Sequence, residues 1–261
     1  MADDFFWYEL MTPDLAGALE FYGKVVGWKT VDHGMTTASG GRYVVLETEG
    51  RGIGGALELT DEMTAGGAHP GWVGYIHVDD VDARTKAVVA AGGTILMPPA
   101  DIPAVGRFAM VADPGGAPFY VMKPLPREGG DPAPLAAGTV GTCGWRELFS
   151  TLGDKGAFDF YAAQFGWETV GEFDMGGTMG VYRLFGHDGA QLGGMMKKPD
   201  QVPVSIWNFY FQVDGIDAGA DRIKAQGGQV VMGPHEVPGG QWIVQGIDPQ
   251  GAFFALLSDM K

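Results

Sequence analysis

Two spacings of hydrophobic residues alternate along the first 123 residues. Apolar residues at every second position predict strands, and apolar residues three or four positions apart predict helices. Asp14 and Asp80 are suited to cap two such helices, and Gly27 and Gly92 are suited to end them. The order of strands and helices is that of two βαβββ units. Strands are predicted over residues 5–10, 43–47, 53–59, 72–78, 95–97, 105–111 and 117–122, and helices over residues 15–26 and 81–91.

The same pattern occurs a second time in the chain. Phe160-Tyr161 repeats Phe21-Tyr22, and Trp207 repeats Trp72 at nearly the same offset along the sequence. Two copies in one order indicate two modules of one fold. Residues 124–139 between them are rich in Pro and Gly, the composition of a semi-extended linker. We therefore predict module 1 over residues 1–123, a linker over 124–139 and module 2 over 140–261. Other repeated positions are Gly27-Trp28 with Gly166-Trp167, Gly54-Gly55 with Gly193-Gly194, Tyr75 with Tyr210, Gly92-Gly93 with Gly227-Gly228 and Asp113-Pro114 with Asp248-Pro249.

Helical crossovers beside short, glycine-punctuated strands predict an α+β fold with helices on one face of a curved sheet. The composition then narrows the classes of possible binding partner. A net charge of −15 argues against nucleic acid, because nucleic-acid binding requires clustered Lys and Arg. No apolar run is long enough to span a membrane and the first residues are acidic, so we expect a cytoplasmic protein with no membrane partner. Cys143 is the single cysteine, so no disulfide can form within the chain. The sequence leaves open whether the protein is a monomer or a homodimer.

The order of the short motifs resembles that of a known superfamily. Asp14, Phe21-Tyr22, Gly27-Trp28, the segment 78–82, Gly92-Gly93 and the segment 113–116 occur in the order typical of the glyoxalase, bleomycin-resistance and extradiol-dioxygenase proteins, the vicinal oxygen chelate superfamily. Residues 99–108 are similar to a two-module bacterial glyoxalase-like branch. The resemblance implies that each module is a pair of βαβββ units forming a curved, cup-like sheet with helices outside. It also implies a divalent metal held by His, Gln or Glu at the centre of the cup.

The residues at the inherited ligand positions are poor metal ligands. None of the three securely placed positions in module 1 can ligate a metal well, and in module 2 only Asn208 has even a weak oxygen donor. At the remaining position, near residues 55–58 and 194–197, only Glu58 could coordinate. We therefore predict no metal there and expect no cofactor. The first-strand position falls on Trp7 and Trp145, the second-unit position on Val73 and Asn208, and the last-strand position on Tyr120 and Ala255.

Alternation along strands predicts which other side chains face the cups. Glu9 and Glu147 lie two residues after Trp7 and Trp145. A carboxylate on such a wall needs a partner, which leaves open a role in function or a structural hydrogen bond to Tyr75 or Tyr210. A metal shared by Glu9 and His77 would need a shifted strand register. These residues lie about 7 and 13 Å along their strands from the metal position that the resemblance implies. His77 and its repeat Gln212 are predicted on the same walls.

Three functions stay open from these residues. The first is a protein that binds a small aromatic or cationic molecule without a metal. The second is a metal-independent lyase, isomerase or hydratase that uses a Glu as base and a Tyr or His as acid, with Glu9, His77 and Glu147 as the candidate catalytic residues. The third is a metal-dependent glyoxalase or dioxygenase with displaced ligands. The predicted ligand-binding residues are Trp7, Glu9, Tyr75, Tyr120, Trp145, Glu147, Asn208, Tyr210 and Gln212.

Overall fold

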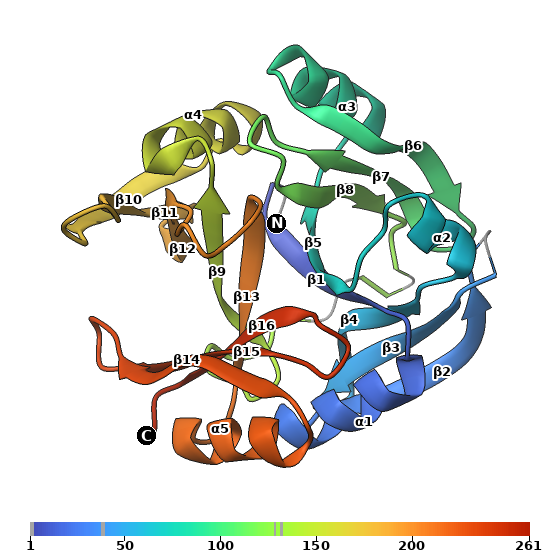
Figure 1. The fold of residues 1–261 in the computed structure, drawn as a ribbon. Helices are drawn as coiled ribbons and strands as arrows, with labels where there is room; N and C mark the ends of the chain where they lie inside the picture. Colours follow the sequence, from blue (N-terminus) through green and yellow to red (C-terminus); the bar gives the residue numbers. More distant parts are fainter. Residues whose placement is uncertain (1–2, 38–39, 128, 131–132) are drawn as a thin grey trace. The chain divides into compact units, whose positions relative to one another are not determined.

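The first sequence repeat forms an eight-stranded sheet (Figure 1). The structure is a computed structural model that describes residues 3–37, 40–127, 129–130 and 133–261. The strand order is β2-β3-β4-β1-β5-β8-β7-β6, in which β1 pairs with β4 and β5 with β8 in parallel. The strands are β1 (Phe5–Thr12), β2 (Lys29–Thr36), β3 (Arg42–Thr48), β4 (Arg51–Glu58), β5 (Gly71–His77), β6 (Thr94–Ile102), β7 (Gly106–Ala112) and β8 (Pro118–Pro124), and the helices are α1 (Leu15–Val25), α2 (Asp61–Ala65) and α3 (Val81–Ala90).

The second repeat forms a sheet of the same design, with the order β10-β11-β12-β9-β13-β16-β15-β14. Two curled sheets in tandem, each made of two βαβββ halves, confirm the predicted α+β class. Strand β2 was missed because most of its side chains are exposed, so that it shows no hydrophobic alternation. The strands are β9 (Cys143–Ser150), β10 (Glu168–Asp174), β11 (Val181–His187), β12 (Ala190–Lys197), β13 (Ile206–Gln212), β14 (Gln229–Glu236), β15 (Trp242–Ile247) and β16 (Phe253–Ser258), and the helices are α4 (Gly153–Phe165) and α5 (Ile216–Ala225).

The predicted helix ends of the first repeat are confirmed. The Asp14 side chain accepts a hydrogen bond from the Gly17 amide at 3.0 Å, and Asp80 accepts one from the Ala83 amide at 2.9 Å. These bonds satisfy amides that the first helical turn leaves without a carbonyl partner. Beyond the helix ends, Gly27 and Gly92 adopt φ values of 93° and 90°, which glycine tolerates best.

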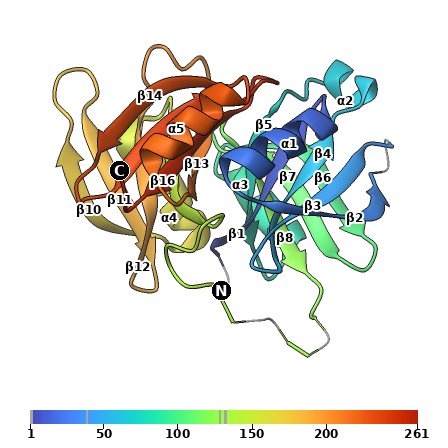
Figure 2. The same cartoon turned by 90° about the horizontal axis from the view of Figure 1, so that it is seen from below.

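The compact units of the structure are each assembled from both repeats. Unit 1 contains Met1–Phe6, Gly74–Pro134 and Arg146–Trp207, and unit 2 contains Trp7–Val73, Leu135–Trp145 and Asn208–Lys261. The division at residues 124–139 therefore stays a prediction about the repeats. In unit 2, α1 contacts α5 (Figure 1), and α5 packs on β14, β15 and β16 (Figure 2).

Each unit contains the same buried trio of hydrogen-bonded side chains, which we call the clasp. In unit 2 the Trp72 indole donates to the Tyr22 hydroxyl at 2.9 Å, and Tyr22 donates to Oδ2 of Asp248 at 3.1 Å. Each clasp combines Tyr and Trp of one repeat with Asp of the other, so the repeated motifs hold the two repeats together. The clasp of unit 1 consists of Trp207, Tyr161 and Asp113, with distances of 2.8 and 3.3 Å.

Burial sets the protonation of the clasp. It raises the pKa of the Asp113 and Asp248 carboxyls, because removal from water disfavours the charged form. Burial, followed by the charge of the adjacent Asp, also raises the pKa of Tyr22 and Tyr161 well above the usual value. The two tyrosines therefore stay neutral donors near neutral pH.

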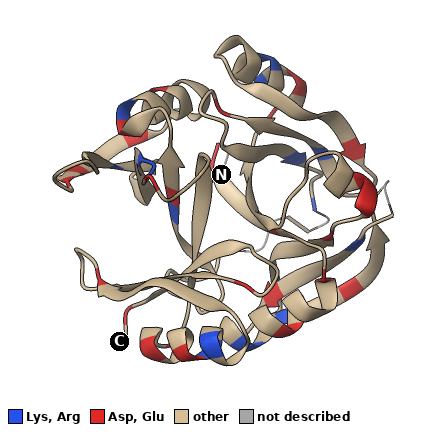
Figure 3. Cartoon of the chain, viewed as in Figure 1, with Lys and Arg blue, Asp and Glu red and all other residues tan. Residues whose placement is uncertain are grey.

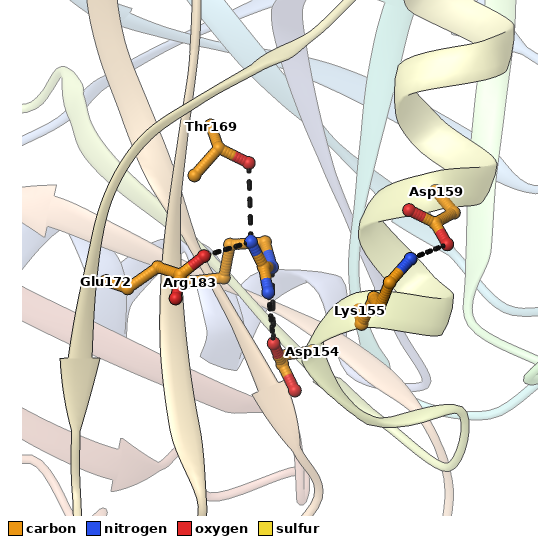
Figure 4. Close-up of polar contacts among 6 residues, drawn as sticks. All are labelled: Asp154, Lys155, Asp159, Thr169, Glu172 and Arg183. Atoms are coloured by element: carbon orange, nitrogen blue, oxygen red, sulfur yellow. Dashed lines mark hydrogen bonds and ion pairs between the residues drawn. The ribbon is translucent and has the colours of Figure 1, made fainter.

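Asp and Glu outnumber Lys and Arg in the chain, and residues of both signs lie on the helices (Figure 3). In unit 1, Arg183 of β11 bonds to Asp154 of α4 at 2.9 Å and to Glu172 of β10 (Figure 4). Arg183 thereby ties the β10–β11 hairpin to the helix. In the described part of the chain, no helix is long and apolar enough to cross a membrane.

Candidate functional site

The two predicted glutamates occupy equivalent, buried positions. Glu9 on β1 is 3% exposed and accepts a hydrogen bond from Tyr43 of β3, whose hydroxyl also receives the Trp7 indole N–H at 2.8 Å. Glu147 on β9 is 7% exposed and accepts a hydrogen bond from the Tyr182 hydroxyl at 3.0 Å. Tyr43 and Tyr182 were not predicted from the sequence. They are separated by the same offset as Phe21 and Phe160 and so are equivalent in the two repeats.

A glycine in the intervening strand allows each tyrosine to reach its glutamate. Gly55 of β4 is in register with Glu9, and a Cβ added to it would lie 2.1 Å from the Tyr43 hydroxyl. Gly194 of β12 is in register with Glu147, and a Cβ there would lie 2.2 Å from the Tyr182 ring. The repeated glycine pairs therefore make room for a cross-strand Tyr–Glu contact.

The Tyr43 hydroxyl is held in its neutral form. Burial, and then the negative charge of Glu9, raise the pKa of Tyr43 well above its usual range. Tyr43 is thus suited to fix the Glu9 carboxylate by donating to it, and poorly suited to release a proton near neutral pH. A structural bond to each glutamate was one of the sequence-based alternatives. The structure shows such bonds from Tyr43 and Tyr182, where Tyr75 and Tyr210 had been considered.

In unit 1, residues of β1, β5, β7 and β8 form a cluster of rings that we call the aromatic wall: Phe6, Tyr75, His77, Phe108 and Tyr120. Tyr75 is in register with Tyr120, and their rings stack with centroids 4.1 Å apart at 15°. The Phe6 ring meets the rings of Tyr75 and His77 edge to face at 6.5 and 6.1 Å, and the Phe108 ring lies 5.9 Å from that of Tyr120. The predicted ligand-binding tyrosines of this repeat therefore contact each other.

In unit 2, strands β13 and β15 carry a polar cluster that we call the amide wall: Asn208, Tyr210, Gln212 and Gln245, all buried. Gln245 Nε2 donates to the Tyr210 hydroxyl at 2.7 Å. Strand alternation places Asn208, Tyr210 and Gln212 on one side of β13. The intervening Phe209 and Phe211 lie edge to face with Tyr8.

A small residue distinguishes the amide wall from the aromatic wall. Ala255 is in register with Tyr210, at the position where Tyr120 faces Tyr75 in the other repeat. Trp145 and Ile243 pack against the cluster of Tyr210, Ala255 and Leu257. The structure thus brings the predicted residues Trp145 and Tyr210 together. Gln245 was missed because its counterpart in the first repeat is the apolar Met110.

Comparison with known proteins establishes the family. The model of the Glyoxalase/Bleomycin resistance protein/Dioxygenase superfamily matches residues 5–121 and 155–256. The chain belongs to this superfamily. The predicted family resemblance is therefore confirmed over both repeats.

Two relatives and one solved structure are similar over most of the chain. CFP32 of Mycobacterium tuberculosis (strain CDC 1551 / Oshkosh), whose name marks it as a candidate glyoxylase, is 34% identical over 96% of this chain and 93% of its own. The anthracycline biosynthesis protein DnrV of Streptomyces peucetius is 30% identical over 96% and 91%. The Mn(II)-bound glyoxalase of Novosphingobium aromaticivorans has the same fold, with a TM-score of 0.66, 18% identity and coverage of 100% of this chain and 83% of that chain.

The metal that some members of the superfamily bind does not fit the donor groups at the inherited positions. The Trp7 indole offers an N–H donor, which bonds to Tyr43, and Val73 and Ala255 offer no ligand atom. The ring of Tyr120 is stacked on Tyr75. Among the described residues, no group of three or more His, Cys, Asp and Glu is placed to hold an ion. The absence of a metal from the working protein stays a prediction.

Proposed function

We propose that this superfamily member binds a small, planar aromatic molecule at the amide wall of its second repeat. The observation that carries the proposal is the replacement of Tyr120 by Ala255 beside an aromatic residue. In the first repeat Tyr75 packs against a second tyrosine ring, whereas Tyr210 is in register with a methyl side chain and has Trp145 packed nearby. A side-chain ring fills the space in one repeat, and a ligand ring takes that place in the other.

Aromatic surface is the chemistry that this position offers. Tyrosine and tryptophan stack on planar ligands through large, rigid rings, and buried amides orient the ligand by hydrogen bonds. The name of DnrV connects that relative with anthracyclines, which are polycyclic aromatic compounds. This connection supports an aromatic ligand for the present chain. Because Glu9 and Glu147 are each bonded to a tyrosine, a cationic ligand is favoured less.

A second candidate function is acid–base catalysis without a metal, as a lyase, isomerase or hydratase. Two observations favour it: the buried carboxylates of Glu9 and Glu147, and the name of CFP32 as a candidate glyoxylase. In this scheme a glutamate takes a proton from the substrate. Replacement of Glu9 and Glu147 by Gln would then abolish turnover while leaving ligand affinity intact.

Calorimetric titration with quinoline and with 1-hydroxyanthraquinone tests the binding proposal. The Ala255→Tyr variant introduces the residue of the first repeat, and we expect it to weaken binding at least tenfold because the new ring occupies the place of the ligand. Tyr120→Phe in the aromatic wall is the matched control, and we expect it to leave affinity within twofold. Unchanged affinity in Ala255→Tyr, or equal losses in both variants, would refute binding at the amide wall.

A further inference from the structure

Asn208 is a buried amide whose polar atoms have no hydrogen-bond partner. Its side chain lies in the middle of β13 and is 1% exposed. Neither Oδ1 nor Nδ2 makes a hydrogen bond to any part of the chain that the structure describes. Buried polar groups are nearly always paired, because burial without a partner loses the bonds that water would provide. An amide with both ends unsatisfied therefore indicates that another molecule completes it.

The fold itself does not require this amide. The equivalent residue of the first repeat is Val73, which is also buried in the same strand of the same sheet design. An apolar side chain of similar breadth is thus compatible with the position. The polar group at Asn208 costs stability without serving the architecture, a pattern that is typical of functional sites.

The surroundings of Asn208 indicate the class of molecule. Tyr210, two residues along β13, and Gln212, four residues along, share its side of the strand. Gln245 bonds to Tyr210, and Trp145 packs against the Tyr210–Ala255 cluster. The amide wall is polar but carries no ionisable acid or base other than the Tyr210 phenol. Neutral donors and acceptors beside aromatic rings fit a neutral, planar ligand with polar groups at one edge.

We propose that Asn208 recognises a neutral aromatic ligand that has one hydrogen-bond donor next to one acceptor, as in a lactam or a cis-amide. A carboxamide presents an acceptor and a donor side by side, so the two groups form a pair of parallel hydrogen bonds with such an edge. A carboxylate ligand would satisfy Nδ2 and leave Oδ1 facing a second acceptor. The inference rests on the proposed function, because it assigns the polar edge of the same aromatic ligand.

Asn208 is the single asparagine of the chain, which permits a direct measurement. Protein labelled with ¹⁵N only at asparagine gives one side-chain amide pair in a heteronuclear NMR spectrum. The probes are 2-quinolone, which has the lactam edge, 1-methyl-2-quinolone, which lacks the donor, and quinoline, which has neither N–H nor carbonyl. We expect 2-quinolone to shift the Asn208 side-chain amide signals and quinoline to leave them nearly in place.

Titration of the Asn208→Val variant, which carries the residue of the first repeat, complements the spectra. In the unmodified protein we expect 2-quinolone to bind at least tenfold more tightly than 1-methyl-2-quinolone. In Asn208→Val this preference should disappear while quinoline affinity stays within twofold. The variant should also melt at an equal or higher temperature, because an unsatisfied amide has been removed. If it fails to fold, the labelled unmodified protein still provides the test.

The outcomes separate this inference from the proposed function. Equal affinity for 2-quinolone and quinoline, an unmoved Asn208 signal at saturation or a preference retained in Asn208→Val would overturn lactam recognition and leave an aromatic site standing. Such results would indicate that a bound water, and not the ligand, satisfies the Asn208 amide. If neither the three probes nor 1-hydroxyanthraquinone bind, the proposed function is overturned as well.

Discussion

The aromatic wall and the amide wall occupy the same place in two copies of one sheet, yet their side chains have diverged. In the first repeat Tyr75 stacks on Tyr120 in a largely apolar cluster, whereas in the second Tyr210 is bonded to Gln245 and in register with Ala255. The clasps, by contrast, are retained in both copies with the same three residue types. Retained positions hold the repeats together, and the positions that differ give the two walls different side-chain chemistry.

Removal of the Tyr120 ring should produce the largest effect on stability. Tyr120→Ala removes a buried, stacked ring from the aromatic wall, and we expect the free energy of unfolding to fall by roughly 3–5 kcal/mol. Urea denaturation of the purified variant measures the change. If the loss is below about 1 kcal/mol, the Tyr120 side chain is not a packing element. The aromatic wall would then be as accessible to a ligand as the amide wall, and the proposed difference between them would not hold.

Removal of the tyrosine hydroxyl should lower the free energy of unfolding equally for the two clasps. The clasps therefore serve as an internal control for the comparison of the two walls. Tyr22→Phe leaves the Trp72 indole and the Asp248 carboxyl without their shared partner, and Tyr161→Phe does the same to Trp207 and Asp113. We expect each variant to lose about 1–3 kcal/mol of unfolding free energy. A loss of unfolding free energy in only one of the two variants would show that the clasps have diverged as the walls have.

The clasp variants also have a defined pH dependence. The pKa of Asp248 is raised above 3.8 by burial, so its contribution to stability is complete below pH 3.8 and is lost as the pH rises through the raised value. The Tyr22 hydroxyl opposes this shift by bonding to the charged form. Tyr22→Phe should therefore raise the pKa of Asp248 further and extend the loss to higher pH. NMR titration of the carboxyl carbon checks the direction, and a fall in the pKa would contradict the assignment.

The sequence predicted the fold because hydrophobic spacing, helix caps and repeated motifs are local features. Asp14 and Asp80 identified their helices in this way. The contact of Tyr43 with Glu9 was missed because it crosses β4, and the order of the strands in a sheet does not follow from hydrophobic spacing. The assembly of each unit from both repeats was missed for a related reason. Tyr22 and Asp248 are 226 residues apart, and no local pattern joins them.

The smallest expected change in stability concerns the first half of each repeat, where both copies have the same Tyr–Glu contact. Glu9→Gln and Glu147→Gln retain an oxygen that accepts the hydrogen bond from the tyrosine hydroxyl, but they remove the negative charge. Because a hydrogen bond to a charged group is stronger than one to a neutral group, we expect each variant to lose about 1 kcal/mol of unfolding free energy.

The affinity for quinoline and 2-quinolone should stay within twofold in both variants, because these carboxylates are engaged by Tyr43 and Tyr182. Denaturation and calorimetry on the same preparations measure the two quantities. Tyr43→Phe and Tyr182→Phe are the matched controls, since they remove the same contacts from the other side while leaving the carboxylates in place. A tenfold loss of affinity with unchanged stability in Glu9→Gln would show that the carboxylate contacts the ligand. Recognition would then include the first half of the repeat, where the two copies are alike, and the contrast between the two walls would no longer account for binding.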